Sequence, residues 1–263
     1  MAIVNATPDS FSDGGRFLAA NEAVAHAFAC VRAGAHIIDI GGESTRPGAD
    51  AVTEQEEQDR VLPVIERLAK ETDALLSIDT YRASTARLAI EAGAHIVNDV
   101  FGLQKDPDMA GVVAATQAGV CIMHTGRDRE KLPDVVEDQF AFLNRSLEIA
   151  QQAAISRNAI VLDPGFGFAK DTDENIALMS RFDELAGFGL PILAGTSRKR
   201  FIGALTGRDG AEERDVGTAA TTAILRLAGA VIFRVHNVTM TRDALSIADA
   251  VLKQKTRIKG GMT

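Results

Sequence analysis

The sequence contains little cysteine, no long apolar segment and fewer basic than acidic residues. Its two cysteines, Cys30 and Cys121, are too few for a secreted scaffold built on disulfides, which favours a reducing compartment. No apolar run is long enough to span a bilayer, and the first residues lack the basic and apolar regions of a signal peptide. We therefore expect a cytoplasmic protein with no membrane partner.

The charge balance argues against general binding of nucleic acid. The chain has 28 Lys and Arg against 36 Asp and Glu, a formal net charge of -8. Nucleic acids and anionic membranes are bound by clustered Lys and Arg, so we expect neither as a partner. Any anionic ligand must be held by local positive charge.

Length and an internal repeat predict the fold. A chain of 263 residues with 46% hydrophobic residues suits a single α/β barrel, and we expect one domain over residues 1–263. A unit of helix end, glycine and apolar strand recurs at residues 32–39, 91–98, 117–124 and 227–234. Its glycines, Gly34, Gly93, Gly119 and Gly229, are expected to end helices with a positive φ.

Four further runs have the composition of buried strands, at residues 3–5, 75–79, 160–165 and 191–197. Helical patterns lie between the strands, one of them opened by Thr53 and Glu56 in a capping-box spacing. Eight alternations of strand and helix favour a single-domain TIM-type (β/α)8 barrel of the α/β class. An open, doubly wound sheet is the alternative.

Polar residues follow the apolar strands. Counting five residues on from each repeat glycine reaches Asp39, Asn98, His124 and Arg234, and the other strands lead to Asn5, Asp79, Asp163 and the Ser-Arg-Lys segment 197–199. His236 points the same way as Arg234, because strand side chains alternate. One such residue is usually a cap or a loop partner, and His124 is equally well explained as a buried structural residue. Eight strand ends in succession instead predict a barrel-rim site for a phosphorylated small molecule.

Three loops differ from the short connections elsewhere. Residues 6–15 and 41–50 are long, rich in turn-forming residues and placed after adjacent strands on this rim, as is typical of lids. Residues 125–134 are highly charged, and we expect them simply to be solvated.

Seven segments together resemble the dihydropteroate synthases of bacterial folate biosynthesis, a pterin-binding family. They are NATPDSFSDGG (5–15), GGESTRPG (41–48), SIDT (77–80), NDV (98–100), DPGFGF (163–168), SRK (197–199) and RVH (234–236). The resemblance covers essentially the whole chain. One motif alone is weak evidence, whereas seven in order at strand ends are highly specific.

The resemblance implies a transferase reaction in which 7,8-dihydropterin-6-ylmethyl diphosphate and 4-aminobenzoate give 7,8-dihydropteroate and diphosphate, with Mg2+ as cofactor. It also implies inhibition by sulfonamides, which imitate 4-aminobenzoate. A homodimer formed through late helices is implied as well. The small, apolar helix expected at 215–228 suits that contact, although packing on the barrel explains it almost as well.

The resemblance also assigns site residues position by position. Asp79, Asn98, Asp163 and Lys199 are implied to hold the pterin, with Met123, Phe168 and Gly195 lining its slot. Asn5, Arg234 and His236 are implied to hold the diphosphate, and Asn5 also reaches the magnesium. Phe11 and Asp13 in the first mobile loop and Thr45 and Arg46 in the second are implied to receive 4-aminobenzoate.

The residues assigned to catalysis are Asp79, Lys199, Arg234 and His236. The resemblance implies that the C–O bond ionises first and that the amine of 4-aminobenzoate then attacks. On this hypothesis Asp79 stabilises the pterin cation, while Arg234, His236 and Mg2+ stabilise the departing diphosphate. Asp39 and His124 have no expected role beyond structural support.

Two features of the sequence depart from the family pattern. Arg200 stands where many relatives have Ser, near the expected position of the aminobenzoate carboxylate. Relatives usually carry a segment before the first strand, so we expect either a truncated chain or a less covered barrel bottom. The alternative function is a methyltetrahydrofolate:corrinoid methyltransferase-like pterin-binding barrel, which would lack the SRK segment and both long loops. A non-catalytic barrel would be expected to have lost Lys199, Arg234 or Asp79.

Overall fold

The computed structural model describes residues 1–6, 13–43 and 52–260. Its strands are β1 Ala2–Asn5, β2 Ile37–Gly41, β3 Leu75–Asp79, β4 Ile96–Asp99, β5 Gly119–Met123, β6 Ile160–Asp163, β7 Leu193–Ala194 and β8 Ile232–Phe233. Its α-helices are α1 Asp13–Arg32, α2 Glu54–Glu71, α3 Ala83–Glu91, α4 Met109–Thr116, α5 Val135–Gln152, α6 Thr172–Ser180, α7 Arg200–Thr206, α8 Asp215–Leu227 and α9 Val238–Gly260. Short 3-10 helices cover Arg157–Ala159, Phe182–Phe188 and Glu212–Arg214.

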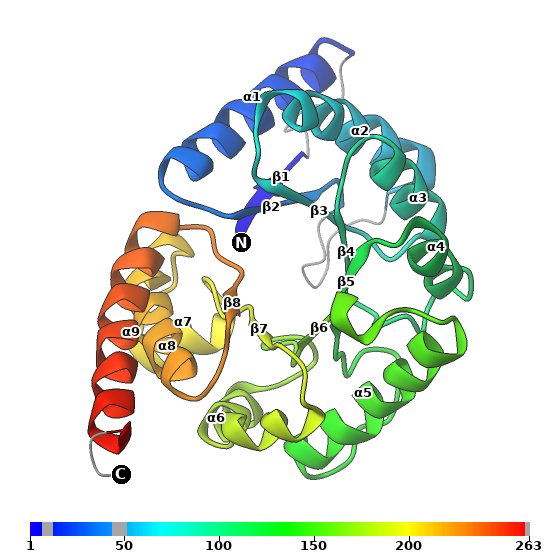
Figure 1. The fold of residues 1–263 in the computed structure, drawn as a ribbon. Coiled ribbons are helices and arrows are strands. Elements are labelled where there is room, and N and C mark those ends of the chain that lie inside the picture. The colour runs from blue at the N-terminus through cyan, green and yellow to red at the C-terminus, as the bar shows by residue number, and fades with distance from the viewer. Residues whose placement is uncertain (7–12, 44–51, 261–263) are drawn as a thin grey trace.

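The strands form a closed parallel barrel, seen end-on in Figure 1. Strands β1 to β6 pair in sequence order and β7 pairs with β8, every pair being parallel. Two single bridges complete the circle: Leu162 with Ile192 joins β6 to the β7 end, and Ala2 with Val235 joins β1 to the β8 end. The predicted (β/α)8 barrel is therefore confirmed, and the open sheet is wrong.

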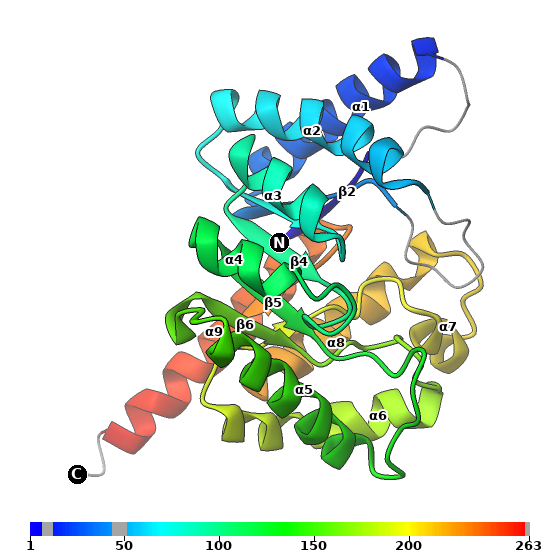
Figure 2. The same ribbon diagram turned by 90° about the vertical axis from the view of Figure 1, so that its right-hand side faces the viewer.

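The helices lie outside the strands (Figures 1 and 2). Helix α2 shows how the sequence specifies this arrangement. Thr53 and Glu56 form the expected capping box at its start, and Val61, Ile65 and Leu68 lie one or two turns apart and are fully buried. The same pattern around the ring builds one hydrophobic core that includes residues of all eight strands.

Three of the four repeat glycines behave as predicted. Gly34, Gly93 and Gly229 have φ values of +95°, +114° and +114°, each two residues after a helix ends. The prediction is wrong for Gly119, which is the first residue of β5. Helix α4 ends one position earlier in its repeat, so Gln117 takes the left-handed conformation instead, at φ +56°.

Two late elements differ in length from their neighbours. Strand β7 is shorter than the expected run of residues 191–197, because Thr196 and Ser197 already belong to the loop that leads to α7. Helix α9 continues beyond the barrel, as Figure 2 shows. Among the described helices, none combines the length and the apolarity needed to cross a membrane.

Candidate active site

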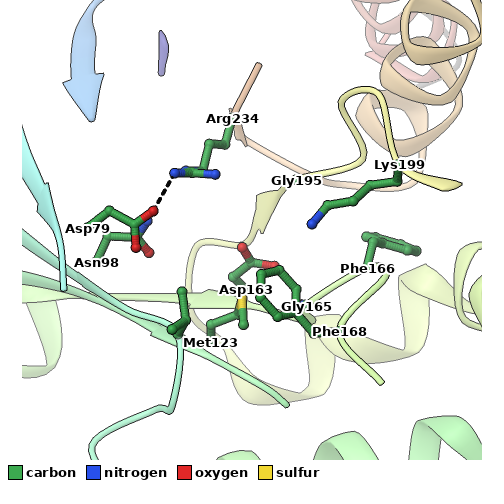
Figure 3. A pocket seen from close by; sticks show the side chains of 11 residues that line it. Asp79, Asn98, Met123, Asp163, Gly165, Phe166, Phe168, Gly195, Lys199 and Arg234 are labelled. Carbon is green, nitrogen blue, oxygen red and sulfur yellow. Dashed lines mark hydrogen bonds and ion pairs between the residues drawn. The ribbon is translucent and has the colours of Figure 1, made fainter. Parts of the chain in front are cut away.

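A pocket opens inside the carboxyl-terminal end of the barrel, and most of the predicted site residues line it (Figure 3). The empty space among its lining residues is about 320 Å3, open solvent at its mouth included. The lining residues are Asp79, Asn98, Val100, Met123, Asp163, Gly165, Phe166, Phe168, Gly195, Lys199 and Arg234. Eight of these are the predicted Asp79, Asn98, Met123, Asp163, Phe168, Gly195, Lys199 and Arg234.

Strand register explains why these residues meet. Asp79 at the end of β3 is the register partner of Asn98 in β4, and Met123 at the end of β5 is the partner of Asp163 in β6. Parallel strands end on the same side of a barrel, so their terminal side chains converge. Residues far apart in the sequence thereby share one cavity.

Arg234 bonds two carboxylates at this pocket, those of Asp79 and Asp39. Its Nη2 donates to Asp79 Oδ2 at 2.6 Å, and its Nε donates to Asp39 Oδ2 at 2.6 Å. Asp39 Oδ2 also accepts a hydrogen bond from Asn98 Nδ2 at 3.1 Å. Asp39, fully buried, therefore connects a residue assigned to the pterin with one assigned to the diphosphate. The sequence indicated no such role for it.

The electrostatics of Asp79 favour a group that titrates near neutrality. Burial raises the pKa of Asp79 to about 7, and the neighbouring Arg234 guanidinium opposes this increase. Burial disfavours the charged carboxylate, whereas the cation favours it. Asp79 can therefore change its charge within the working range of an enzyme.

Asp163 and Lys199 face each other across the pocket (Figure 3). Asp163 is buried and accepts a hydrogen bond from the backbone N–H of Gly165 at 2.7 Å. Burial raises its pKa, and this hydrogen bond and then Lys199 oppose the increase. Burial also lowers the pKa of Lys199 to about 8. The Lys199 ammonium lies 4.1 Å from the centre of the Phe168 ring, a cation–π contact that holds it at the pocket edge.

His236 lies beside the start of α9, outside the residues that line the pocket. Ser197 Oγ accepts from the His236 backbone N–H at 3.1 Å and lies 2.9 Å from His236 Nδ1. The Ser197 hydroxyl can donate to Nδ1, which leaves the proton of the neutral ring on Nε2. The first turn of α9 begins at Val238, and the Asn237 side chain accepts from the Met240 backbone N–H in this turn at 3.1 Å.

The remaining predicted residues are placed differently. Asn5 is exposed at the end of β1 and is not among the pocket-lining residues. Asp13 begins α1, but its side chain is not described. Phe11, Thr45 and Arg46 lie outside the described residues.

Segment 125–134 corrects one expectation, because part of it is not simply solvated. Arg129 donates to both carboxylate oxygens of Asp138, at 2.9 and 2.6 Å, and Asp138 Oδ2 lies 2.9 Å from His124 Nε2. His124 is fully buried, and burial lowers its pKa to about 4. The segment is therefore tied to a buried histidine beneath the pocket.

Sequence reasoning assigned no role to several residues of this region. Val100, Gly165 and Phe166 line the pocket, and all three lie in the NDV and DPGFGF motifs. No sequence motif pointed to Lys170. It lies two residues beyond the DPGFGF motif, and only the fold turns its buried side chain toward His124.

The described residues offer no group of three or more His, Cys, Asp or Glu side chains that could hold a metal ion. A magnesium ion at this rim would need oxygen donors from elsewhere, such as an amide oxygen, substrate phosphates and water. Asn5 supplies an exposed amide oxygen of that kind.

Comparison with known families identifies the class of protein. The family model described as pterin binding enzyme matches residues 1–236. The chain therefore belongs to the pterin-binding enzymes.

Within this family, the relatives are dihydropteroate synthases. The chain is 45% identical to dihydropteroate synthase of Bacillus subtilis over 262 residues, which cover 100% of this chain and 90% of that protein. It also matches a dihydropteroate synthase structure from Clostridium difficile, described in the presence of pteroic acid. That match has a TM-score of 0.91 and 45% identity, over 95% of each chain. A Yersinia pestis dihydropteroate synthase described with a sulfonamide drug matches with a TM-score of 0.89 and 41% identity, over 97% of this chain and 93% of that one. The resemblance drawn from the motifs is confirmed, and the chain is a transferase of this family.

Proposed function

We infer that the chain acts as a dihydropteroate synthase, joining 7,8-dihydropterin-6-ylmethyl diphosphate to 4-aminobenzoate with loss of diphosphate. The observation that carries this inference is the pocket in which Asp163, Asn98 and Lys199 surround a small cavity at the barrel rim. No observation favours the corrinoid methyltransferase alternative, since the chain retains the SRK segment and both long loops.

The experiment is an assay of diphosphate release from the pterin diphosphate, with and without 4-aminobenzoate. Release that depends on both substrates is expected. Release that is independent of either substrate, or its absence from folded protein, would contradict the function.

The pterin is held by groups whose hydrogen-bonding types match its edge. The Asp163 carboxylate accepts from the 2-amino group and a ring N–H, and the Lys199 ammonium donates to ring acceptors. Both groups lose water in the pocket, so a ligand without the matching atoms leaves them unpaired. Met123 and Phe168 are buried beside them and supply the apolar faces of the slot.

Asp79 and Arg234 stabilise the two opposite charges that develop when the C–O bond ionises. Asp79 in its carboxylate form stabilises the pterin cation, and Arg234 stabilises the departing diphosphate. Arg234 is suited to this task because two of its five N–H groups hold Asp39 and Asp79. The other three N–H groups can donate to phosphate oxygens.

The diphosphate extends from Arg234 toward His236 and the first turn of α9. His236 donates through Nε2, and backbone N–H groups at a helix start bind anions. The end of the last strands is also the usual phosphate-binding position in barrels of this type.

Asn5 would hold Mg2+ at the diphosphate site. The fit rests on donor chemistry: Asn5 offers a hard amide oxygen at the rim, and Mg2+ typically takes its remaining ligands from phosphate and water. When bound, the ion neutralises charge on the leaving diphosphate.

4-Aminobenzoate is received by the two long loops, through Phe11 and Asp13 in the first and Thr45 and Arg46 in the second. Sulfonamides compete for the same place, as expected from the sulfonamide complex of the Yersinia pestis relative. Inhibition by a sulfonamide that is overcome by added 4-aminobenzoate is the expected result. Inhibition that 4-aminobenzoate does not relieve would contradict this placement.

The enzyme is a homodimer that associates through its late helices. Helices α8 and α9 lie side by side on the barrel (Figures 1 and 2). Large apolar side chains are exposed on them, among them Val216, Ile224, Ile247 and Val251. Such a set of exposed apolar residues is costly in a monomer and typical of a subunit contact. A solution mass near twice 27.9 kDa is expected, and Val216→Lys with Ile247→Glu should give the monomer.

The enzyme works in the cytoplasm. Both cysteines are free and buried, as suits a reducing compartment.

A further inference from the structure

A set of buried polar side chains lies next to the pocket and has no part in the reaction as described so far. Lys170 is at its centre, with 9% of its surface exposed. Its ammonium lies 2.9 Å from His124 Nδ1 and donates to the Gly165 carbonyl at 3.0 Å. In the described part of the chain, no carboxylate forms an ion pair with Lys170.

Burying a lysine in this way is costly, because its charge leaves water without a carboxylate at hydrogen-bonding distance. Burial lowers the pKa of Lys170 to about 7. Lys131, on the same side of the molecule, differs: it is partly exposed, pairs with Glu174 and donates to the Ala169 carbonyl. A buried lysine held this way is more typical of functional sites than of a stabilising ion pair.

The proton positions around His124 follow from its neighbours. A charged Lys170 can only donate, so its contact with His124 Nδ1 is a hydrogen bond when the neutral ring carries its proton on Nε2. Nε2 lies 2.9 Å from Asp138 Oδ2 and 2.9 Å from Arg129 Nη2, which donates to the same Asp138 oxygen. Asp138 and Arg129 thereby hold the ring that holds Lys170.

The two peptide groups that flank Gly165 are both fixed by this arrangement. The Gly165 N–H donates to Asp163 Oδ1 at 2.7 Å, and the Gly165 carbonyl accepts from Lys170 and from the Phe168 backbone N–H at 3.1 Å. The Asp163 carbonyl also accepts from the His124 backbone N–H at 2.8 Å. Rotation of the backbone at Gly165 would therefore break the contact to Lys170 and move the carboxylate that faces the pterin.

We propose that Lys170 is a positioning residue for pterin binding: with His124 as its acceptor, it holds the Gly165 peptide that aims the Asp163 carboxylate into the pocket. This role deepens the proposed function and rests on it. Lys170 itself does not line the pocket. Its effect on the substrate passes through Asp163.

The first test is Lys170→Met, which keeps the length of the side chain and removes the donor. Binding of 6-hydroxymethylpterin, which lacks the diphosphate, is measured by titration calorimetry. We expect about tenfold weaker binding, the effect of losing one charge-assisted hydrogen bond. The KM for 4-aminobenzoate should change little. Lys131→Met is the matched control, and its pterin affinity should equal that of the unmodified chain.

A double-mutant cycle distinguishes positioning from general loss of structure. If Lys170 acts through Asp163, then Lys170→Met should weaken pterin binding much less in an Asp163→Asn background than in the unmodified chain. If Lys170→Met weakened pterin binding by the same factor in both backgrounds, the proposal would be overturned. Unchanged pterin affinity in folded Lys170→Met would overturn it as well.

A second pair of variants covers the case in which Lys170→Met does not fold. His124→Asn keeps an acceptor near the place of Nδ1, whereas His124→Leu removes it. Pterin binding retained in the first and lost in the second is expected; equal binding in both overturns the proposal. These binding measurements are separate from turnover, so failure of the unmodified chain to release diphosphate would contradict the proposed function alone.

Discussion

Arg234 Nη2 and Asp79 Oδ2 are 2.6 Å apart, although the two residues are separated by 155 positions and lie at the ends of β8 and β3. The guanidinium keeps a carboxylate with a raised pKa in place at the pocket wall. It also retains donors for an anion. Cation and carboxylate are therefore both present before substrate arrives, which is what electrostatic stabilisation of a charge-separating step requires.

Asp79→Asn should lower kcat far more than it weakens pterin binding. The amide keeps the shape of the side chain but cannot stabilise a cation, so we expect a loss in kcat of about 100-fold, the order found for single preorganised groups. Steady-state kinetics and pterin titration measure the two effects separately. Equal losses in both would show that Asp79 only binds the ring.

The pH dependence of kcat/KM should be bell-shaped with a maximum near pH 7. The pKa of Asp79 is raised to about 7, so its active carboxylate form is lost as the pH falls below that value. The pKa values of Lys170 and Lys199 are lowered to about 7 and about 8, so their ammonium forms are lost as the pH rises. In Asp79→Asn the acidic limb should disappear and the basic limb remain. An unchanged acidic limb would assign it to another group.

Removing the Arg234 guanidinium should destabilise the fold as well as the site. Arg234→Met leaves the fully buried Asp39 without its cation, and breaking such a pair typically costs about 3–5 kcal/mol. Urea unfolding measures the free energy. Adding Asp39→Asn to Arg234→Met should recover a large part of the lost free energy of unfolding, because an unpaired amide is less costly to bury than an unpaired carboxylate. No recovery would mean that Asp39 does not depend on Arg234.

Gly165→Ala should disrupt the pocket. Gly165 has a φ of +66°, and an added Cβ would lie 1.9 Å from the backbone oxygen of His124. The strained conformation alone costs about 1–3 kcal/mol, and the contact can only be relieved by moving the loop that directly follows Asp163. Both the free energy of unfolding and pterin affinity should fall.

Gly111→Ala is the matched control for this change. Gly111 lies in α4, and its added Cβ would meet no atom within 4 Å. Alanine should therefore raise the free energy of unfolding by about 0.5–1 kcal/mol and leave binding unchanged. A pterin affinity unchanged in Gly165→Ala as well would show that the Gly165 backbone does not position Asp163.

The sequence determined the barrel and most of its rim residues, because both depend on local rules. Glycines after helices, apolar strands and a polar residue at each strand end repeat along the chain, and parallel strands must end together. Asp79, Asn98, Asp163 and Arg234 were found in this way, and all four line the pocket. Gly119 was misjudged because the end of its helix shifted by one residue, which the repeat does not reveal.

The tertiary structure alone decided which side chains hold these residues in place through hydrogen bonds. Asp39 and His124 looked like structural strand-end residues, and Lys170 carried no pattern at all. Their partners come from other elements of the barrel: Arg234 for Asp39, Asp138 for His124, and the His124 ring for Lys170. A strand-end pattern gives the direction of a side chain, but hydrogen bonds between distant segments depend on how the closed barrel brings those segments together. The sequence therefore identified the residues that face the substrate, and only the folded chain identified those that hold them in place.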